Sequence, residues 1–295
     1  MNQTTLEMLL HPQHLTKDIK EYLLAEYADD ISNIKTVLQD YLNQDYWDSK
    51  NERLAIIKTF DLQTVILDVL TSVVLIANDY MPLISVCSAK QIRGMDKVQS
   101  ATTMGELLHC IDTTELILWD ITKDNKRIIK SNMALSDELE NRLKLLCVLP
   151  PMMVKPRKLI HNRSSGFLTI NNDSLILGDK ENHHDECISL DVLNTLNSQA
   201  LCLDLDICYK FEKEFTSDFD IDTDEYKNQK KTYDKAKEQF EFFRDNLADS
   251  AIFFTHKVDK RGRVYSQGYQ MNTQGTSYEK ACINLKTKEY VTGEL

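Results

Sequence analysis

The segment Asp259-Lys260-Arg261-Gly262-Arg263-Val264-Tyr265 organises the C-terminal part of this sequence. Residues 251–256 before it are mostly apolar and predict a short strand. Residues 263–265 predict the returning strand, with a tight turn between the two. Gly262 can adopt the positive φ that such a turn requires. The turn would therefore present Arg261 and Arg263 at fixed offsets from one another.

A second turn and a helix follow this hairpin. Asn272-Thr273-Gln274-Gly275 predicts the turn, and Thr276 with Glu279 forms a capping box that predicts a helix reaching Lys288. Lys280 would lie in the first turns of that helix, near backbone amides that have no partner within the helix. The sequence thus brings a further basic side chain close behind the hairpin.

This group of side chains allows two interpretations. Two guanidinium groups with forked donors, the ring of Tyr265 and the ammonium group of Lys280 would suit a nucleic-acid backbone and its bases. Alternatively, the segment is a surface hairpin whose arginines pair with Asp259 or with other carboxylates. The residues alone leave both interpretations open.

Composition restricts where a nucleic-acid site could lie. The 295 residues carry a net charge of −11, which argues against a protein that coats duplex DNA by bulk electrostatics. A nucleic-acid site on this chain must therefore be local. With 8 Gly, 5 Pro and 27% charged residues, the chain is expected to be globular and rich in helices.

Cysteine usage and apolar runs indicate a soluble protein of a reducing compartment. The 7 Cys include no CxxC pair, as expected for free thiols in a cytoplasm. The longest apolar run, residues 65–77, is interrupted by Asp68 and is too short to span a bilayer. The N-terminus lacks the cationic start and apolar run of a secretory signal. We expect a cytoplasmic protein with no membrane partner.

Apolar spacing predicts helices over most of the N-terminal half. Residues 1–60 predict a pair of helices, and residues 64–87 predict a core helix that breaks near Pro82. Further helices are expected at 104–118 and 136–146, with a charged loop at 123–130 between them.

The helical pattern ends where the second half of the chain begins. Three prolines within residues 149–158 predict an extended segment, on which Lys155 and Arg157 are either solvated side chains of a connection between domains or nucleic-acid contacts. Helical spacing resumes at 190–205, and the longest helix is predicted at 226–248.

Two acidic or histidine-rich segments could suggest metal sites, and neither pattern fits well. His183-His184-Asp185 lacks a distant partner at ligand spacing. Residues 218–229 alternate aspartates with other residues, but they lack the glycine and the final glutamate of a calcium loop. We expect no metal bound by this chain alone. A metal hydrolase that uses His183, His184 and Asp185 is retained as a third interpretation.

Three segments together resemble the single-subunit DNA-directed RNA polymerases of phages and mitochondria. Residues 259–265 match the family's D-x-R-G-R-x-Y segment, and Asn272 to Gly275 followed by Lys280 resembles its N-P-Q-G segment. Residues 149–158 with Gly166-Phe167 resemble the family's L-P-P-M-V-x-P segment and glycine-aromatic turn, and 193–199 resembles its L-N-x-L-Q-x-T helix. The sequence departs from the family at Lys260, Thr273 and one inserted residue. The matches cover residues 149–288.

The resemblance implies roles for individual residues. Arg261, Arg263 and Tyr265 would lie beside the template strand or the RNA–DNA hybrid, with Asp259 holding the hairpin. Lys280 would lie near the entering nucleotide or the template, and helix 226–248 would take the place of the thumb. The remaining expected nucleic-acid contacts are Gln274, Lys155 and Arg157.

The resemblance also implies an enzyme divided between two chains. In the family, the two metal-binding aspartates, a catalytic lysine and a fingers tyrosine follow the D-x-R-G-R segment at a long distance, and this sequence ends before them. The expected protein is the small, N-terminal subunit of a heterodimeric bacteriophage RNA polymerase of the N-four-like kind, a nucleotidyltransferase active in transcription in the cytoplasm of an infected bacterium. It would have no catalytic residue of its own.

The partners follow from this expectation. They are a larger subunit with palm and fingers that binds Mg²⁺, the DNA template, the RNA transcript and a single-stranded DNA-binding recruitment factor. The alternative is a stand-alone protein that binds single-stranded nucleic acid or a host component and has no polymerase activity.

The expected fold class is predominantly α with short β elements (α+β), the N-terminal and thumb-like part of a right-hand polymerase that a partner chain completes. Four segments are expected. They are a helical domain at 1–148, a connection at 149–210, an acidic loop with a thumb-like helix at 211–250, and the start of the palm at 251–295.

Overall fold

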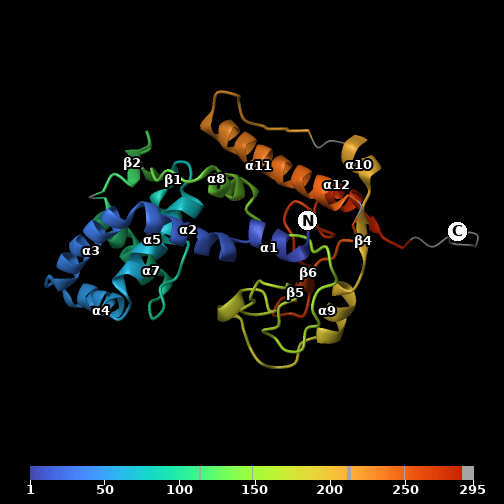
Figure 1. Ribbon diagram of the computed structural model, residues 1–295, viewed down its shortest axis with the longest axis horizontal. Helices are drawn as coiled ribbons and strands as arrows, with labels where there is room; N and C mark the ends of the chain where they lie inside the picture. The colour runs from blue at the N-terminus through green and yellow to red at the C-terminus, as the bar shows by residue number, and fades with distance from the viewer. Residues whose placement is uncertain (113, 148, 211–213, 249, 288–295) are drawn as a thin grey trace, which may run out of the picture. The chain divides into compact units, whose positions relative to one another are not determined.

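The computed structural model describes residues 1–112, 114–147, 149–210, 214–248 and 250–287, and the chain divides into two units (Figure 1). Unit 1 consists of Met1–Leu15 and Asn141–Leu295, and unit 2 consists of Thr16–Glu140. The expected segments at 149–210, 211–250 and 251–295 all fall within unit 1. About 49% of the chain is helix and 10% is strand, which confirms an α+β fold.

Unit 2 is a group of helices with one small antiparallel sheet. Its helices are α2 (Pro12–Glu26, which begins in unit 1), α3 (Ala28–Asn43), α4 (Asp48–Ile57), α5 (Leu62–Ile76), α6 (Leu83–Cys87) and α7 (Lys97–Ile111). The sheet has the order β1-β3-β2, formed by Met81–Pro82, Arg127–Ser131 and Ile117–Ile121. The helical prediction for residues 1–60 is confirmed, with four helices (α1 to α4) in place of two.

Helix α5 is the core helix predicted from the apolar run. Asp61 caps its first turn by accepting a hydrogen bond from the Thr64 backbone N–H at 2.8 Å. Ile66, Leu70 and Val73 are at most 1% exposed. Asp68 interrupts the run without burying a bare charge, because Lys20 and Lys90 both pair with it. Within the described ranges no single helix is both long and apolar enough to cross a bilayer; α4 and α5 pass that test only together, and they meet at a bend of 97°.

The predicted helix at 104–118 is wrong at both ends. Helix α7 begins at Lys97 with a capping box on Asp96 and ends at Ile111, and residues 117–121 form strand β2. Of the predicted charged loop at 123–130, the first residues form a turn and the rest belong to strand β3. Strand β3 pairs with β2, so that Ile129 of β3 lies opposite Trp119 of β2. The strands form because each satisfies the other's backbone groups, a pairing that helical spacing does not reveal.

Unit 1 joins the N-terminal helix to the second half of the chain. Its helices are α1 (Gln3–Leu10), α8 (Asp137–Leu145, which begins in unit 2), α9 (Leu190–Asn197), α10 (Leu205–Lys210), α11 (Asp224–Leu247) and α12 (Ser277–Ala281), with a 3₁₀ turn at Asp179–Glu181. Its strands form two antiparallel pairs: β4 (Leu201–Leu203) with β7 (Ile283–Leu285), and β5 (His256–Val258) with β6 (Val264–Ser266).

The long helix predicted at 226–248 is confirmed as α11. Thr223 caps it by accepting a hydrogen bond from the Tyr226 backbone N–H at 3.2 Å. Phe243 and Leu247, on its C-terminal half, are at most 1% exposed and pack in one hydrophobic cluster with Phe254. Figure 1 shows α11 beside the shorter α12. The apolar seam therefore anchors the end of α11 in the core of unit 1.

Two other helix predictions in unit 1 are too long. The helix expected at 190–205 ends at Asn197, because residues 201–203 pair with β7 as strand β4. The helix expected to reach Lys288 is only α12, which ends at Ala281 and is followed by β7. Lys288 lies outside the described residues. In both cases a strand partner at least 80 residues away decides the local structure.

The predicted extended segment at 149–158 is confirmed. Met152 forms an antiparallel bridge with Phe253, and the Arg157 backbone N–H donates to the Gly166 carbonyl at 2.8 Å. Prolines 150, 151 and 156 are buried, and Lys155 and Arg157 are exposed. The segment thus runs beside the residues that lead into β5.

Candidate nucleic-acid interface

The predicted hairpin at 259–265 is present and tightly closed. Val258 lies opposite Val264, and the backbones of Asp259 and Arg263 are joined by a 2.9 Å hydrogen bond. The Gly262 N–H donates to the Asp259 carbonyl, also at 2.9 Å. Gly262 has φ +81°, a conformation that other residues resist. A side chain at that position would meet open space, so the turn requires glycine for its backbone conformation.

The carboxylate of Asp259 holds the turn together. Its Oδ1 accepts hydrogen bonds from the backbone N–H groups of Arg261 and Arg263 at 2.9 and 3.0 Å. Its Oδ2 accepts from Nε of Arg263 at 2.7 Å. Partial burial raises the pKa of Asp259, but the hydrogen bonds and charge of Arg263 outweigh it and hold the pKa below its ordinary value. Asp259 therefore remains ionised.

Both sequence interpretations of the arginines describe part of this arrangement. Arg261 and Arg263 pair with Asp259 at 3.4 and 2.7 Å, as the surface-hairpin interpretation expects. Their side chains nevertheless remain 71% and 55% exposed. The guanidinium of Arg263 lies 5.6 Å from the ring centre of Tyr265. An arginine carries five N–H donors, so both side chains keep outward donors for another acceptor.

Gln274 has a scaffolding role that the sequence analysis missed. Its side-chain amide accepts from the Ser266 N–H at 3.0 Å and donates to the Val264 carbonyl at 3.2 Å. Asn272 reinforces the same edge, because its amide donates to the carbonyls of Ser266 and Gly268. The Asn-x-Gln-Gly segment therefore braces β6 by side chains. Whether Gln274 also contacts nucleic acid remains a prediction.

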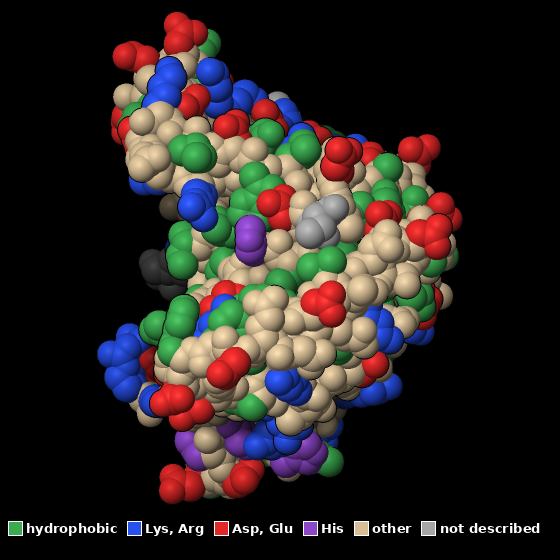
Figure 2. Space-filling view, turned by 90° about the vertical axis from the view of Figure 1, so that its left-hand side faces the viewer, with side chains coloured by type: hydrophobic (Ala, Val, Ile, Leu, Met, Phe, Trp, Pro, Cys, Tyr) green, Lys and Arg blue, Asp and Glu red, His purple; other side chains and the backbone are tan. Residues whose placement is uncertain are grey.

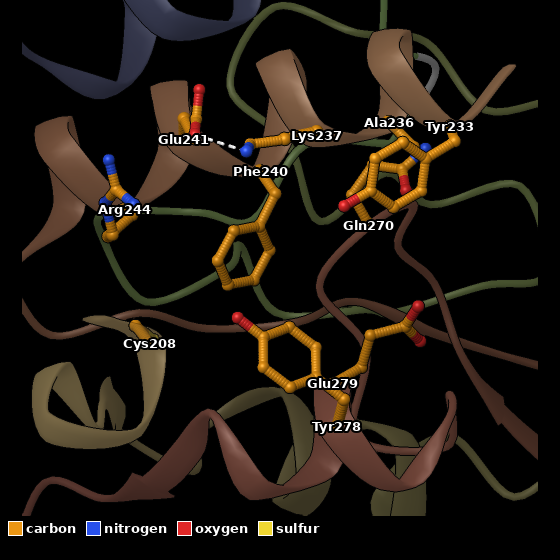
Figure 3. Close-up of a pocket in the computed structure, with 10 residues that line it drawn as sticks. All are labelled: Cys208, Tyr233, Ala236, Lys237, Phe240, Glu241, Arg244, Gln270, Tyr278 and Glu279. Carbon is orange, nitrogen blue, oxygen red and sulfur yellow. Dashed lines mark ion pairs between the residues drawn. The ribbon is translucent and has the colours of Figure 1, made fainter. Parts of the chain in front are cut away.

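Lys280 is an exposed residue of the short helix α12. The predicted capping box is present, with Thr276 and Glu279 each accepting the other's backbone N–H. Figure 3 shows Tyr278 and Glu279 of α12 facing α11 across a small pocket, with the Tyr278 ring 5.7 Å from that of Phe240. The described contacts thus place α12 against α11, and Lys280 is exposed on it. No contact given for the described residues joins Lys280 to the hairpin arginines.

The basic segment of Lys155 and Lys158 lies against α9. Lys155 and Lys158 line a cleft of about 300 Å³ together with Asn194, Thr195 and Asn197 of α9. Helix α9 in turn contacts β5, the first strand of the hairpin. The structure therefore connects two of the predicted basic segments through one helix.

Basic residues form no broad field on the face drawn in Figure 2. Lys and Arg side chains there are scattered among Asp and Glu. This pattern agrees with the net charge of −11 and with a local site.

The histidine segment at 183–185 is an irregular stretch in which side-chain hydrogen bonds hold His183. Nδ1 of His183 lies 2.9 Å from the Ser174 hydroxyl, and Nε2 lies 3.0 Å from an Asp185 oxygen. Among the residues that the structure describes, no group of three or more His, Cys, Asp or Glu side chains is placed to hold a metal ion. Both ring nitrogens of His183 are already engaged, so the metal-hydrolase interpretation gains no support from the geometry.

Comparison with known proteins adds no assignment. No model of a known protein family matches this chain, and no curated protein matches it either.

Proposed function

We propose that this chain is a subunit of a DNA-directed RNA polymerase that lines the path of the template strand and the RNA–DNA hybrid. The observation that carries the proposal is the hairpin at 259–265, in which a glycine turn and Asp259 present two exposed guanidinium groups beside a tyrosine ring. This geometry suits phosphate contacts with a ring available for stacking. The resemblance of the same residues to the polymerase segment supplies the specific function.

In this proposal each residue has a role that suits its side chain. Arg261 and Arg263 bind phosphates, Tyr265 packs on a base or sugar, and Asp259 orients both arginines. Lys155 and Arg157 extend the basic path past α9, Gln274 braces β6, and Lys280 lies near the entering nucleotide or template. A larger partner subunit supplies the aspartates that hold two Mg²⁺ ions for in-line phosphoryl transfer. Helix α11 takes the place of the thumb.

The first prediction concerns the salt dependence of binding. Arg263→Ala should weaken binding of single-stranded DNA and reduce the slope of log K against log salt concentration by about 0.7, the contribution of one phosphate contact. Arg127→Ala, which removes the same charge from β3 in unit 2, is the control and should leave the slope unchanged. Fluorescence anisotropy across a salt series measures both. Equal slopes for Arg263→Ala and wild type would contradict the phosphate contact.

A second experiment tests the polymerase itself. The chain is co-expressed with candidate phage polypeptides that carry the family's metal-binding aspartates, and RNA synthesis is assayed on a single-stranded template. The proposal expects synthesis only when both chains are present, and it expects Arg263→Ala to assemble but to elongate poorly. Full activity without this chain would refute it. Strand binding by the chain with no partner-dependent synthesis would instead favour the stand-alone binding protein.

A further inference from the structure

A cavity of about 330 Å³ with both polar and apolar lining residues lies against the first strand of the hairpin. Its rim includes Gln13 and Asn171, which are exposed, and its floor includes Phe167, Asn197 and His256, which are 6%, 3% and 9% exposed. Small-molecule sites in proteins occupy roughly 300–1,000 Å³. The cavity is thus large enough for one small ring-containing group that enters from the rim.

The cavity carries no uncompensated charge at neutral pH. Burial lowers the pKa of His256 to about 4, and burial with the nearby His14 lowers that of His11 to about 4. Lys257 on the wall pairs with Asp179 at 2.8 Å, and Asp173 on the rim pairs with Lys180 at 3.4 Å. A phosphate would find no free cation here. A neutral group that both donates and accepts hydrogen bonds would fit better.

Asn197 on the floor retains an unused hydrogen-bonding atom. Its Oδ1 lies 2.9 Å from Nδ1 of His256, and its Nδ2 is buried with no hydrogen-bond partner among the described residues. If the amide were turned over, the unused atom would be the oxygen, so one polar atom remains in either orientation. A Cβ at Gly166 would lie 3.8 Å from Nδ2 and 2.8 Å from Thr255 Cγ2. A side chain at residue 166 would therefore collide with Thr255 and contact the amide, and glycine avoids both.

The cavity lies close to the arginines of the hairpin. Lys257 on its wall pairs across the strands with Tyr265, and Arg263 follows two residues nearer the turn, a rise of roughly 7 Å. Side-chain amides recognise the edges of nucleobases by paired hydrogen bonds, and apolar rings pack on their faces. Asn197 and Phe167 supply both kinds of group on the floor.

We infer that this cavity receives one unpaired nucleobase of the single strand whose phosphates contact Arg261 and Arg263. Asn197 bonds the edge of the base, and Phe167 packs against it. This inference rests on the proposed contact between the hairpin and a single strand, and it adds a base-binding subsite to it.

The test compares strands with and without bases on the full chain. Fluorescence anisotropy measures binding of a short thymidine oligonucleotide and of the same strand with abasic sites, which keep the sugars and phosphates. The wild-type chain should bind the base-bearing strand roughly tenfold more tightly. Asn197→Ala should remove this preference and keep the salt slope. Asn246→Ala is the matched control, because that amide is exposed on α11, bonds the Phe242 carbonyl and does not line the cavity.

A second variant guards against misfolding. Phe167→Leu keeps an apolar cavity-lining side chain and removes the ring assigned to packing on the base, so it should fold and lose part of the base preference. A preference that is absent in wild type, or unchanged in both Asn197→Ala and Phe167→Leu, would overturn the inference. Free thymidine that binds more tightly than the strand would also overturn it, since the occupant would then be a nucleoside.

The outcomes separate this inference from the proposed function. If Arg263→Ala weakens binding of both strands and wild type shows no base preference, the phosphate contact stands and the base subsite is refuted. If Arg263→Ala changes neither strand, the phosphate contact is refuted, and with it the inference that depends on it.

Discussion

Asp259 shows how one residue can serve a fold and a site together. Its carboxylate accepts hydrogen bonds from the backbone N–H groups of Arg261 and Arg263, which stabilises the turn. It also accepts a hydrogen bond from the Arg263 side chain. Because only part of each guanidinium is used, a phosphate could add to the arrangement without breaking it. The ion pairs therefore orient the two arginines and leave some of their N–H donors unpaired with Asp259.

A pH prediction follows from His256. Its pKa falls from an ordinary 6.5 to about 4 in the folded chain, so below pH 6.5 the unfolded state binds a proton that the folded state does not. The free energy of unfolding should therefore fall by about 2–3 kcal/mol between pH 7 and pH 4.5 from this residue. His256→Gln keeps an amide donor for Asn197 and should show a correspondingly smaller loss. Urea unfolding at both pH values measures the difference, and equal losses would contradict it.

Helix α11 is anchored at both ends by different means. Its C-terminal half buries Phe243 and Leu247 in the hydrophobic cluster of unit 1, and Gln239 donates to the Leu146 carbonyl at 2.8 Å. Its N-terminal half is largely charged and packs Tyr226 and Tyr233 around Phe215, with ring centres 5.4 and 5.2 Å apart. The stability of the helix should therefore depend mainly on its C-terminal half.

Truncation of the seam tests this dependence. Phe243→Ala should lower the free energy of unfolding by about 3–5 kcal/mol, because the Phe243 side chain is only 1% exposed and its removal leaves a cavity in the core. Phe219→Ala, at a side chain that is 45% exposed, is the control and should change it by no more than about 0.5 kcal/mol. Chemical denaturation of the full chain gives both values. Similar small losses for the two variants would show that the seam does not anchor α11.

At the scale of the whole chain, each unit buries apolar side chains of its own. The cluster around Phe243 and Phe254 consists only of unit 1 residues, and α5 supplies the core of unit 2. Unit 1 is built from both ends of the chain, since Glu7 of α1 is buried and accepts the backbone N–H groups of Leu168 and Thr169. The units should therefore respond separately to a core mutation.

Hydrogen exchange tests this independence. Leu70→Ala removes a fully buried side chain from α5 and should speed amide exchange across residues 16–140. Exchange in α11 and in β5 should remain unchanged, because their protection depends on the other core. Mass spectrometry of peptides from the exchanged full chain measures both regions. Equal acceleration in both would show that the chain unfolds as one cooperative unit.

Features that depend on neighbouring residues could be predicted from the sequence. The seam of α11, the cap of α12 and the Gly262 turn each arise from side chains a few residues apart, so their patterns are visible locally. The candidate arginines, Tyr265 and Asp259 were found in the same way. Strands β4 and β7 were missed, because each is three residues long and its partner lies at least 80 residues away. Strand β2 was missed for another reason: it forms a local hairpin with β3, and that hairpin was assigned to a helix and a loop.

The sequence by itself determined the core helix α5, the long helix α11, the hairpin turn and the residues exposed at that turn, because these follow from local periodicity and backbone conformation. Only the tertiary structure decided that residues 1–15 join the second half of the chain, that Gln274 braces β6 and that Asn197 of α9 meets His256 of β5. The physical reason is that burial and long-range hydrogen bonding depend on which segments the folded chain brings together, and no local pattern contains that information.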